Sequence, residues 1–196
     1  MNTDIAAIHQ FWFGPLDEAG RAEPAQERLW FGGGAEFDAA VAGRFDGLVR
    51  RALAGELDHW AGDDAGLIAL LLLLDQFTRN IFRATPEAFA GDSKALAMAQ
   101  RALAEGRQLA LPAIHRVFLY LPLEHCEDLA VQEQSVNLFT ELAASTDGAG
   151  VSDFLRYAVA HRDVIARFGR FPHRNAVLGR TSTPDELAYM ETHGGF

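Results

Sequence analysis

The sequence of 196 residues predicts an all-α protein, and three observations support this class. Apolar residues recur at helical spacing in the longer segments, such as 35–54. No segment alternates apolar and polar residues as a half-buried strand does. Capping residues and glycines mark helix ends. We therefore expect antiparallel helical hairpins joined by short turns. The length suits one domain or two small ones, and we expect a single domain over 1–196.

The N-terminal part predicts two helices with a polar stretch between them. We expect a helix over residues 3–13, ended by Gly-Pro. Residues 17–28 are polar and are interrupted by Gly and Pro, so we expect a loop or a weak helix there. The aromatic pair 30–31 should anchor this stretch to the core, before a flexible turn of three glycines at 32–34. A long helix should follow over 35–54.

The central segment is the most informative stretch of the chain. Residues 67–74 are all apolar, too few to cross a membrane, which needs about 20, but enough for a helix buried on every side. Asp75, Arg79 and Arg83 follow at helical spacing and share one face, with Asn80 beside them. Because a buried unpaired charge is costly, we expect the rest of the protein to supply partners for this stripe.

Three more helices are expected in the middle of the chain. Asp92 can cap a helix over 93–105. Another helix should open at Pro112, and Pro122 should break or kink it. The next helix should continue to about residue 144. Acidic residues stand near its start, where they favour the helix dipole: Glu124, Glu127 and Asp128.

The C-terminal part predicts a loop, a long helix and a short one. Residues 145–150 are the clearest loop, and a helix should cover about 152–168. Residues 169–175 cannot continue as regular helix, because Phe-Pro interrupts them. The segment 183–186 is a capping box with Pro at the first helical position, so a short final helix should follow.

Composition and charge exclude several partners. A net charge of −10 should repel nucleic acid and anionic membranes. Cys126 is the only cysteine, which rules out an internal disulfide and suits a reducing compartment. The N-terminus has no basic start or apolar signal core, so we expect a cytoplasmic protein.

Three blocks of residues resemble the signatures of a known family: LDQFTRNIFR at 74–83, LPLEHCED at 121–128 and RFGRFPHRNAVLGR at 167–180. Residues 11–14 and 182–184 fit its two ends. The chain is thereby similar, over nearly its whole length, to the bacterial family called domain of unknown function 924. One departure is that Thr stands at position 78, where Pro is frequent in the family. The resemblance implies a single all-α domain of tetratricopeptide-like hairpins, and it implies no activity.

The three blocks also carry the candidate site. Our leading hypothesis is a polar groove that binds a small anionic molecule or a peptide carboxylate, because Arg takes such groups bidentately. The arginines would hold the anion, the acids would orient them, and Asn and His would add specificity. The expected ligand-binding residues are Asp75, Arg79, Asn80, Arg83, Glu124, His125, Arg167, Arg170, His173, Arg174 and Asn175.

Other roles of these candidate residues stay open. The charged residues can instead form ion pairs that lock the helices together. An enzyme, most plausibly a hydrolase or lyase, would use His125 or His173 as acid–base. A protein-interaction module is the usual role of helical-hairpin stacks. His125 and Asp128 could share a metal with His161 and Asp163, but we expect neither a metal nor a cofactor. The sequence does not determine the oligomeric state.

Overall fold

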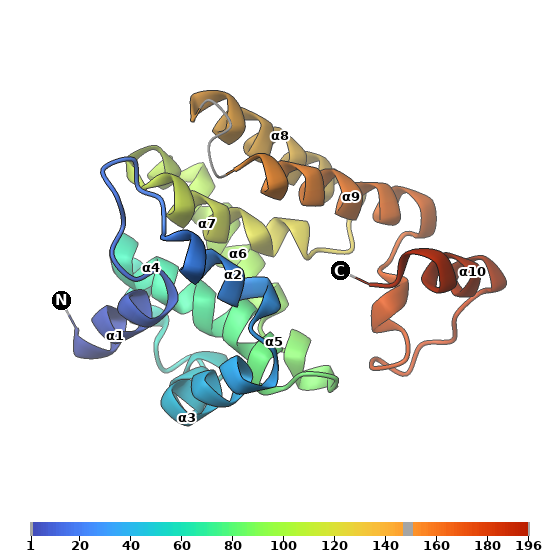
Figure 1. The fold of residues 1–196 in the computed structure, drawn as a ribbon, viewed down its shortest axis with the longest axis horizontal. Coiled ribbons are helices and arrows are strands. Elements are labelled where there is room, and N and C mark those ends of the chain that lie inside the picture. Colours follow the sequence, from blue (N-terminus) through green and yellow to red (C-terminus); the bar gives the residue numbers. More distant parts are fainter. Residues whose placement is uncertain (1, 147–150, 196) are drawn as a thin grey trace. The chain divides into compact units, whose positions relative to one another are not determined.

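The computed structural model describes residues 2–146 and 151–195, and this part of the chain contains helices and turns but no strand. The prediction of an all-α protein is therefore confirmed. The chain divides into two compact units, which Figure 1 shows as ribbons. Unit 1 is formed by residues 1–83 and 87–122, and unit 2 by residues 84–86 and 123–196. The single domain over 1–196 and its tetratricopeptide-like character stay predictions.

Unit 1 is built from helices and short helical turns. No helix in the described ranges is long and apolar enough to span a membrane. The α-helices of unit 1 are α1 (Thr3–Trp12), α2 (Pro24–Gly32), α3 (Gly34–Leu53), α4 (Asp64–Leu71), α5 (Thr78–Ile81), α6 (Asp92–Ala104) and most of α7 (Ala113–Glu124). The shorter pieces are the 3₁₀ turns η1 (Asp58–Gly62), η3 (Pro86–Phe89, whose first residue belongs to unit 2) and η4 (Arg107–Ala110), and the π-helical turn η2 (Leu72–Phe77).

The central segment forms the core of unit 1, as its composition predicts. Every residue from Leu67 to Thr78 is buried. Aromatic rings pack against it: Trp12 lies 5.2 Å from Phe77 and 6.2 Å from Trp30, between ring centroids. Trp30 also donates its indole N–H to the carbonyl of Trp12 at 2.8 Å. Trp30 therefore anchors its helix to the core, whereas the side chain of Phe31 lies outside the described part.

The stretch before α3 is more helical than its composition suggests. Pro24 opens α2 at the first helical position, and the helix continues to Gly32. The glycine turn is reduced to Gly33, because α3 begins at Gly34. Gln26 donates its amide N–H to the carbonyls of Phe11 and Trp12, both at 2.8 Å. These bonds fix α2 on the end of α1, and a single-sequence pattern does not reveal them.

The expected helix cap at Asp92 is wrong, and of the break or kink expected at Pro122 the break is wrong. Asp92 does not cap α6, since the helix starts at Asp92 itself and its carboxylate accepts hydrogen bonds from Arg79. Pro122 does not break α7, which runs on to Glu124. A proline near a helix C-terminus removes only one backbone hydrogen bond. The residues around it, from Val117 to Leu123, are all buried, so their packing holds the helix together.

Unit 2 contains the helical hairpin of α8 (Leu129–Ser145) and α9 (Ser152–Phe168), then the 3₁₀ turn η5 (Pro172–Arg174) and α10 (Pro184–His193). Figure 1 shows α8 and α9 side by side and antiparallel. The bounds predicted for α9 are confirmed. Asp128 caps α8, and Thr183 and Glu186 form the predicted capping box of α10. Within the expected loop 145–150, residues 147–150 lie outside the described part.

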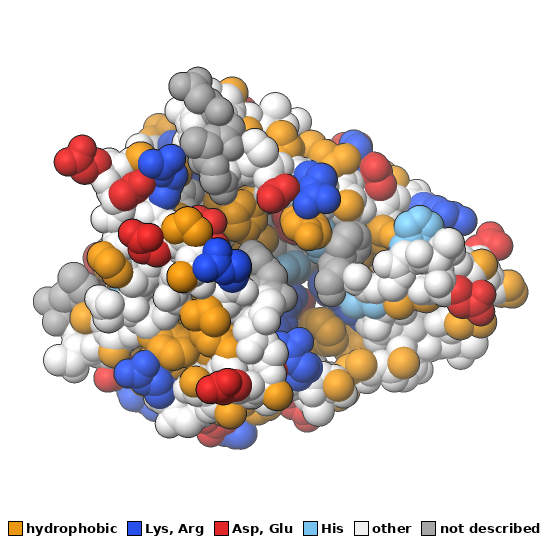
Figure 2. All heavy atoms as spheres, viewed as in Figure 1, with side chains coloured by type: hydrophobic (Ala, Val, Ile, Leu, Met, Phe, Trp, Pro, Cys, Tyr) orange, Lys and Arg blue, Asp and Glu red, His pale blue; other side chains and the backbone are white. Residues whose placement is uncertain are grey.

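The surface carries charges of both signs. Figure 2 shows acidic and basic side chains interspersed over the face in view, with apolar groups between them. The net charge of −10 is thus not accompanied by a continuous basic patch on this face.

Candidate functional site

The structure divides the candidate residues into two groups. The stripe of the central segment lies in unit 1: Asp75, Arg79, Asn80 and Arg83. The candidates of the second and third blocks lie in unit 2: Glu124, His125, Arg167, Arg170, His173, Arg174 and Asn175.

In unit 1, Arg79 is engaged by acids of its own unit. One of its terminal nitrogens donates to the backbone carbonyl of Asp75 at 2.7 Å and to Asp92 Oδ1 at 2.8 Å, and the other donates to Asp92 Oδ2 at 3.0 Å. Asp75 Oδ1 lies 3.2 Å from Arg79. Burial opposes the charge of Arg79, but the two carboxylates raise its pKa above the ordinary value. Asp92 thus ties the end of the central segment to α6.

Arg83 and Asn80 converge on one acid of α3. Arg83 donates to both carboxylate oxygens of Asp38, at 2.6 and 2.9 Å, and Asn80 donates its amide to the same carboxylate at 2.7 Å. The hydrogen bonds from Arg83, more than those from Asn80, lower the pKa of Asp38. The unit 1 stripe therefore links helices through ion pairs, as the structural alternative expects.

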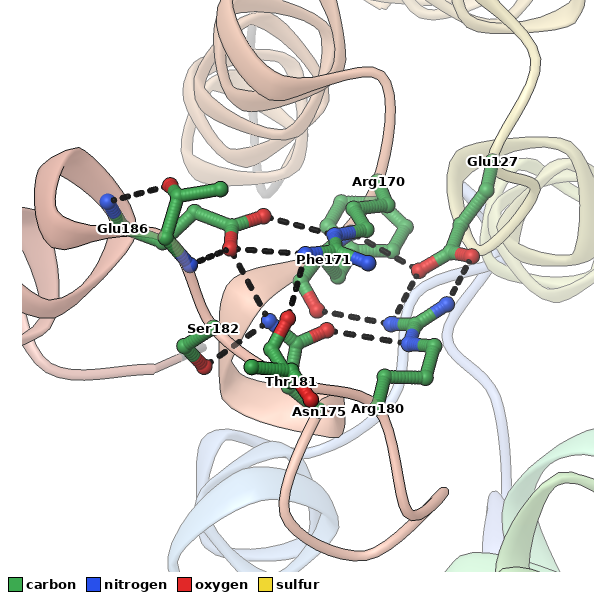
Figure 3. Close-up of polar contacts among 9 residues, drawn as sticks. Glu127, Arg170, Phe171, Asn175, Arg180, Thr181, Ser182 and Glu186 are labelled. Carbon is green, nitrogen blue, oxygen red and sulfur yellow. Dashed lines mark hydrogen bonds and ion pairs between the residues drawn. The ribbon is translucent and has the colours of Figure 1, made fainter.

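The third block forms a polar network in unit 2, shown in Figure 3. Arg180 donates from both terminal nitrogens to Glu127, at 2.6 and 2.9 Å. The Phe171 backbone joins the same pair, because its N–H donates to Glu127 at 2.7 Å and its carbonyl accepts from Arg180 at 3.0 Å. Glu127 and Arg180 thereby fix the irregular segment that follows α9, and with it the ring of Phe171.

Arg170 and Asn175 take part in a second pair of the same network. Arg170 donates to both oxygens of Glu186, at 2.6 and 2.8 Å. Asn175 donates to Glu186 at 3.3 Å and to Ser182 Oγ at 3.0 Å. The hydrogen bonds from Arg170 are the main reason that the pKa of Glu186 falls to about 2. Arg170 and Asn175 thus attach the start of α10 to the third block.

Arg167 does not join this network in the described structure. Its side chain is exposed, and its guanidinium lies 4.7 Å from the centroid of the Phe168 ring and 5.7 Å from that of Tyr189. Arg167 is therefore placed to stack on aromatic rings.

Unit 2 contains a buried carboxylate–imidazole pair. Glu124 and His161 are 3% and 6% exposed, and Glu124 Oε1 lies 3.1 Å from His161 Nδ1. The same Nδ1 lies 2.9 Å from the carbonyl oxygen of Tyr157. A carbonyl accepts and never donates, so Nδ1 carries the ring proton. In the neutral ring, Nε2 is then the acceptor nitrogen.

Basic groups surround His161. Its ring centroid lies 6.1 Å from that of His125 and 5.4 Å from that of Phe171. The guanidinium of Arg174, a residue 6% exposed, lies 4.4 Å from the centroid of the Phe171 ring. Burial lowers the pKa of His161 to about 3, and the charges of His125, Arg174 and His173 act in the same direction. We call Arg174, His125, His161 and His173 the basic cluster.

His161 is a functional candidate that the three sequence blocks do not contain. Helical spacing places it on the buried face of α9 with Ala158, Val164 and Ile165. A buried histidine needs a polar partner, so the helical spacing alone marks His161 as a residue with a specific contact. Across residues 2–146 and 151–195, no three His, Cys, Asp or Glu side chains are grouped so as to hold a metal ion.

Comparisons with known proteins give a family and a related structure, both without an assigned activity. The comparison with curated proteins gives no significant match. The structure of a protein of unknown function, ATU0120 from Agrobacterium tumefaciens, matches with a TM-score of 0.81 and 38% sequence identity, over 96% of this chain and 97% of that one. The family model described as bacterial protein of unknown function (DUF924) matches residues 8–194. The chain therefore belongs to this bacterial DUF924 family, as the three sequence blocks indicate.

Proposed function

We propose that the basic cluster of unit 2 binds a small anion or the carboxylate of a peptide. The observation that carries this proposal is the placement of Arg174, buried beside a neutral histidine and near two more histidines. Each of these neighbours makes a further positive charge on His161 unfavourable. The positive charge of the Arg174 guanidinium favours a negative charge brought to the cluster.

Arg174 is the most deeply buried of the candidate arginines. Arg79, Arg83 and Arg170 each donate to carboxylates within their own unit through two or more hydrogen bonds. Those bonds attach helices and turns to one another within each unit. The guanidinium of Arg174 lies over the ring of Phe171, close enough to His161 to lower its pKa. A guanidinium in such a partly apolar setting binds a carboxylate or phosphate more strongly than one in water.

The burial of the cluster is graded. His161 and Arg174 are buried, whereas His125 and His173 are half-buried. The half-buried histidines would meet the anion first, and Arg174 would neutralise it. The bond of Glu127 and Arg180 to the Phe171 backbone keeps the ring under Arg174 in place. The proposal thus narrows the expected anion site to one unit and gives the ion pairs around it a positioning role.

Titration calorimetry with inorganic phosphate and with succinate, at pH 7 and low salt, tests this function. The wild type should bind at least one of the two, and Arg174→Gln should bind at least tenfold more weakly. Arg167→Gln is the matched control, since it removes an exposed arginine of the same block and should bind like the wild type.

Two results would overturn the proposal. One is a wild-type protein that binds neither anion, and the other is an Arg174→Gln variant with wild-type affinity. Circular dichroism must show that the variant is folded. If it is not, His173→Gln at the half-buried edge replaces it and should weaken binding as well.

The protein-interaction alternative has less support. Among the described residues, the exposed large apolar side chains come from different elements instead of one groove. They are Leu29, Leu109, Leu129, Tyr157, Leu178 and Leu187. Single exposed apolar residues are ordinary on protein surfaces and need no partner.

A further inference from the structure

We infer that a pocket of unit 1, beside His9 and His115, binds a small uncharged aromatic compound that carries a hydroxyl group. The pocket has a volume of about 430 Å³, within the range of about 300–1,000 Å³ that is usual for small-molecule sites. The residues that line it all belong to unit 1. The inference is therefore independent of the anion proposed for the basic cluster of unit 2, and either can fail without the other.

Three parts of unit 1 form the walls of this pocket. Ala6, His9 and Gln10 lie three and four positions apart, so they share one face of α1. The start of α4 lies beside α1 (Figure 1) and forms the second wall. The third wall runs from the end of η4 into the start of α7. The side chains of Ala6, Gln10 and Ala110 are exposed, so the pocket opens to solvent and a ligand can enter it.

Hydrogen bonds hold the walls of the pocket together. His9 donates from Nε2 to the carbonyl of Ala65 at 2.8 Å, which joins α1 to α4. Arg107 of η4 donates to Asp64 Oδ1 at 2.7 Å and to a carbonyl of η1 at 2.8 Å. Both neighbouring walls are thus fixed to the start of α4, and a ligand does not have to order them when it binds.

The two imidazoles supply the polar contacts of the pocket. Because a carbonyl only accepts, His9 carries its proton on Nε2, and the acceptor of the neutral ring is Nδ1. His115 meets His9 and Phe13 through ring contacts, and within residues 2–146 and 151–195 no hydrogen bond engages its imidazole. A neutral imidazole has one donor and one acceptor nitrogen. A hydroxyl group both donates and accepts, so it matches what these rings offer.

The charges at the pocket are either suppressed or matched. Burial lowers the pKa of His115 to about 4, and it lowers the pKa of His9 more than the nearby Asp63 raises it. Both rings are therefore neutral near pH 7. The carboxylate of Asp64 is paired with the guanidinium of Arg107. A charged ligand would lose its hydration here without gaining a counter-ion, and this favours an uncharged one.

The other lining side chains suit the body of an aromatic ligand. Apolar side chains come from all three walls: Ala6, Ala65, Ala110, Leu111 and Pro112. The ring centroids of His9 and His115 lie 5.1 Å apart. Aromatic rings attract one another at centroid distances of about 4.5–7 Å, so a ligand ring gains contacts that an aliphatic chain does not. A rigid ring also loses little conformational freedom on binding.

NMR signals of the histidine rings, followed at pH 7 while 4-cresol is added, test this inference. The signals of His9 and His115 should move, and those of His59 and His161 should stay. Toluene, 4-methylbenzoate and 4-methylbenzylamine share the methylated ring of 4-cresol but lack its hydroxyl group. Each should bind about threefold to tenfold more weakly, the factor that one neutral hydrogen bond supplies. His115→Phe should reduce the preference for 4-cresol over toluene, and His59→Phe, outside the pocket, should keep it.

A matched pair of α1 variants locates the binding. Ala6→Phe fills the pocket and should weaken the binding of 4-cresol at least tenfold. Ala7→Phe adds the same ring at an exposed position that does not line the pocket, and it should bind like the wild type. Urea midpoints must show that both variants are folded, and if Ala6→Phe is not, Ala110→Phe replaces it. Unmoved His9 and His115 signals, wild-type affinity in the filled variant, or equal binding of any of the three analogues would overturn the inference.

Discussion

Acid should destabilise unit 1 through a pair of partly buried histidines. The ring centroid of His115 lies 5.1 Å from that of His9 and 4.5 Å from that of Phe13. His9 Nε2 lies 2.8 Å from the carbonyl oxygen of Ala65, so it carries a proton and donates. Burial lowers the pKa of His115 to about 4, and the neighbouring His9 acts in the same direction. Burial also lowers the pKa of His9.

The sign of the effect follows from proton binding in the two states. Between the unfolded pKa of 6.5 and the folded pKa of about 4, unfolded His115 holds a proton that the folded ring does not. Stability therefore falls as the pH is lowered through this window. At pH 5, about 1.5 pH units below 6.5, the loss at about 1.36 kcal/mol per unit is about 2 kcal/mol. The shifted carboxylates, such as Asp38, lose their contribution only at lower pH, below their unfolded pKa.

Urea unfolding followed by tryptophan fluorescence measures this loss with a signal from unit 1, because all three tryptophans, Trp12, Trp30 and Trp60, lie in that unit. The wild type should lose about 2 kcal/mol more stability between pH 7 and pH 5 than His115→Phe does. His59→Phe removes an exposed histidine and should behave like the wild type. An identical loss in the wild type and in His115→Phe would refute the reasoning, since the titrating group would lie elsewhere.

Three further predictions concern stability. Arg79→Met should destabilise unit 1 by about 3 kcal/mol, which is the low end for breaking a buried ion pair, because the Arg79 side chain is 22% exposed. The urea midpoint followed by tryptophan fluorescence measures this loss. Arg50→Met removes one partner of an exposed ion pair and should change the midpoint little. Gly91→Ala should lower the free energy of unfolding by about 2 kcal/mol or more, because the new Cβ would lie 2.1 Å from a backbone oxygen. Gly47→Ala in α3 meets open space and should raise the free energy of unfolding by about 0.5–1 kcal/mol in the same assay. Thr183→Ala should cost unit 2 about 1 kcal/mol by circular dichroism, because it removes the cap of α10, and an unchanged midpoint would contradict that role.

The parts of the fold that depend on local chemistry could be predicted from the sequence. The bounds of α9 follow from its periodicity and from Gly169, which adopts the left-handed conformation after the last turn. The capping box of α10 involves residues only three positions apart. The burial of the central segment follows from its composition. Its π-helical turn does not, because the counting of i, i+4 positions assumes a regular α-helix.

The partners of the charged residues could not be predicted in the same way. Arg79 and Arg83 bind Asp92 and Asp38, which lie 13 and 45 residues away in the sequence. Which acids these arginines bind depends on how the helices pack, and the sequence of a single protein does not specify that packing. The sequence places Glu124 and Glu127 in the second block, near the start of a helix. It did not show that one holds His161 and the other holds Arg180.

The NMR signals of the histidine rings, followed while inorganic phosphate is added, test the central claim most directly. They report the place of binding and the tautomer of His161 in one experiment. The anion site predicts that the signals of His125, His161 and His173 move, that those of His9, His59 and His115 stay, and that the ring nitrogens of His161 show a proton on Nδ1. Movement of the unit 1 signals alone, or a His161 ring with its proton on Nε2, would contradict the assignment of the site.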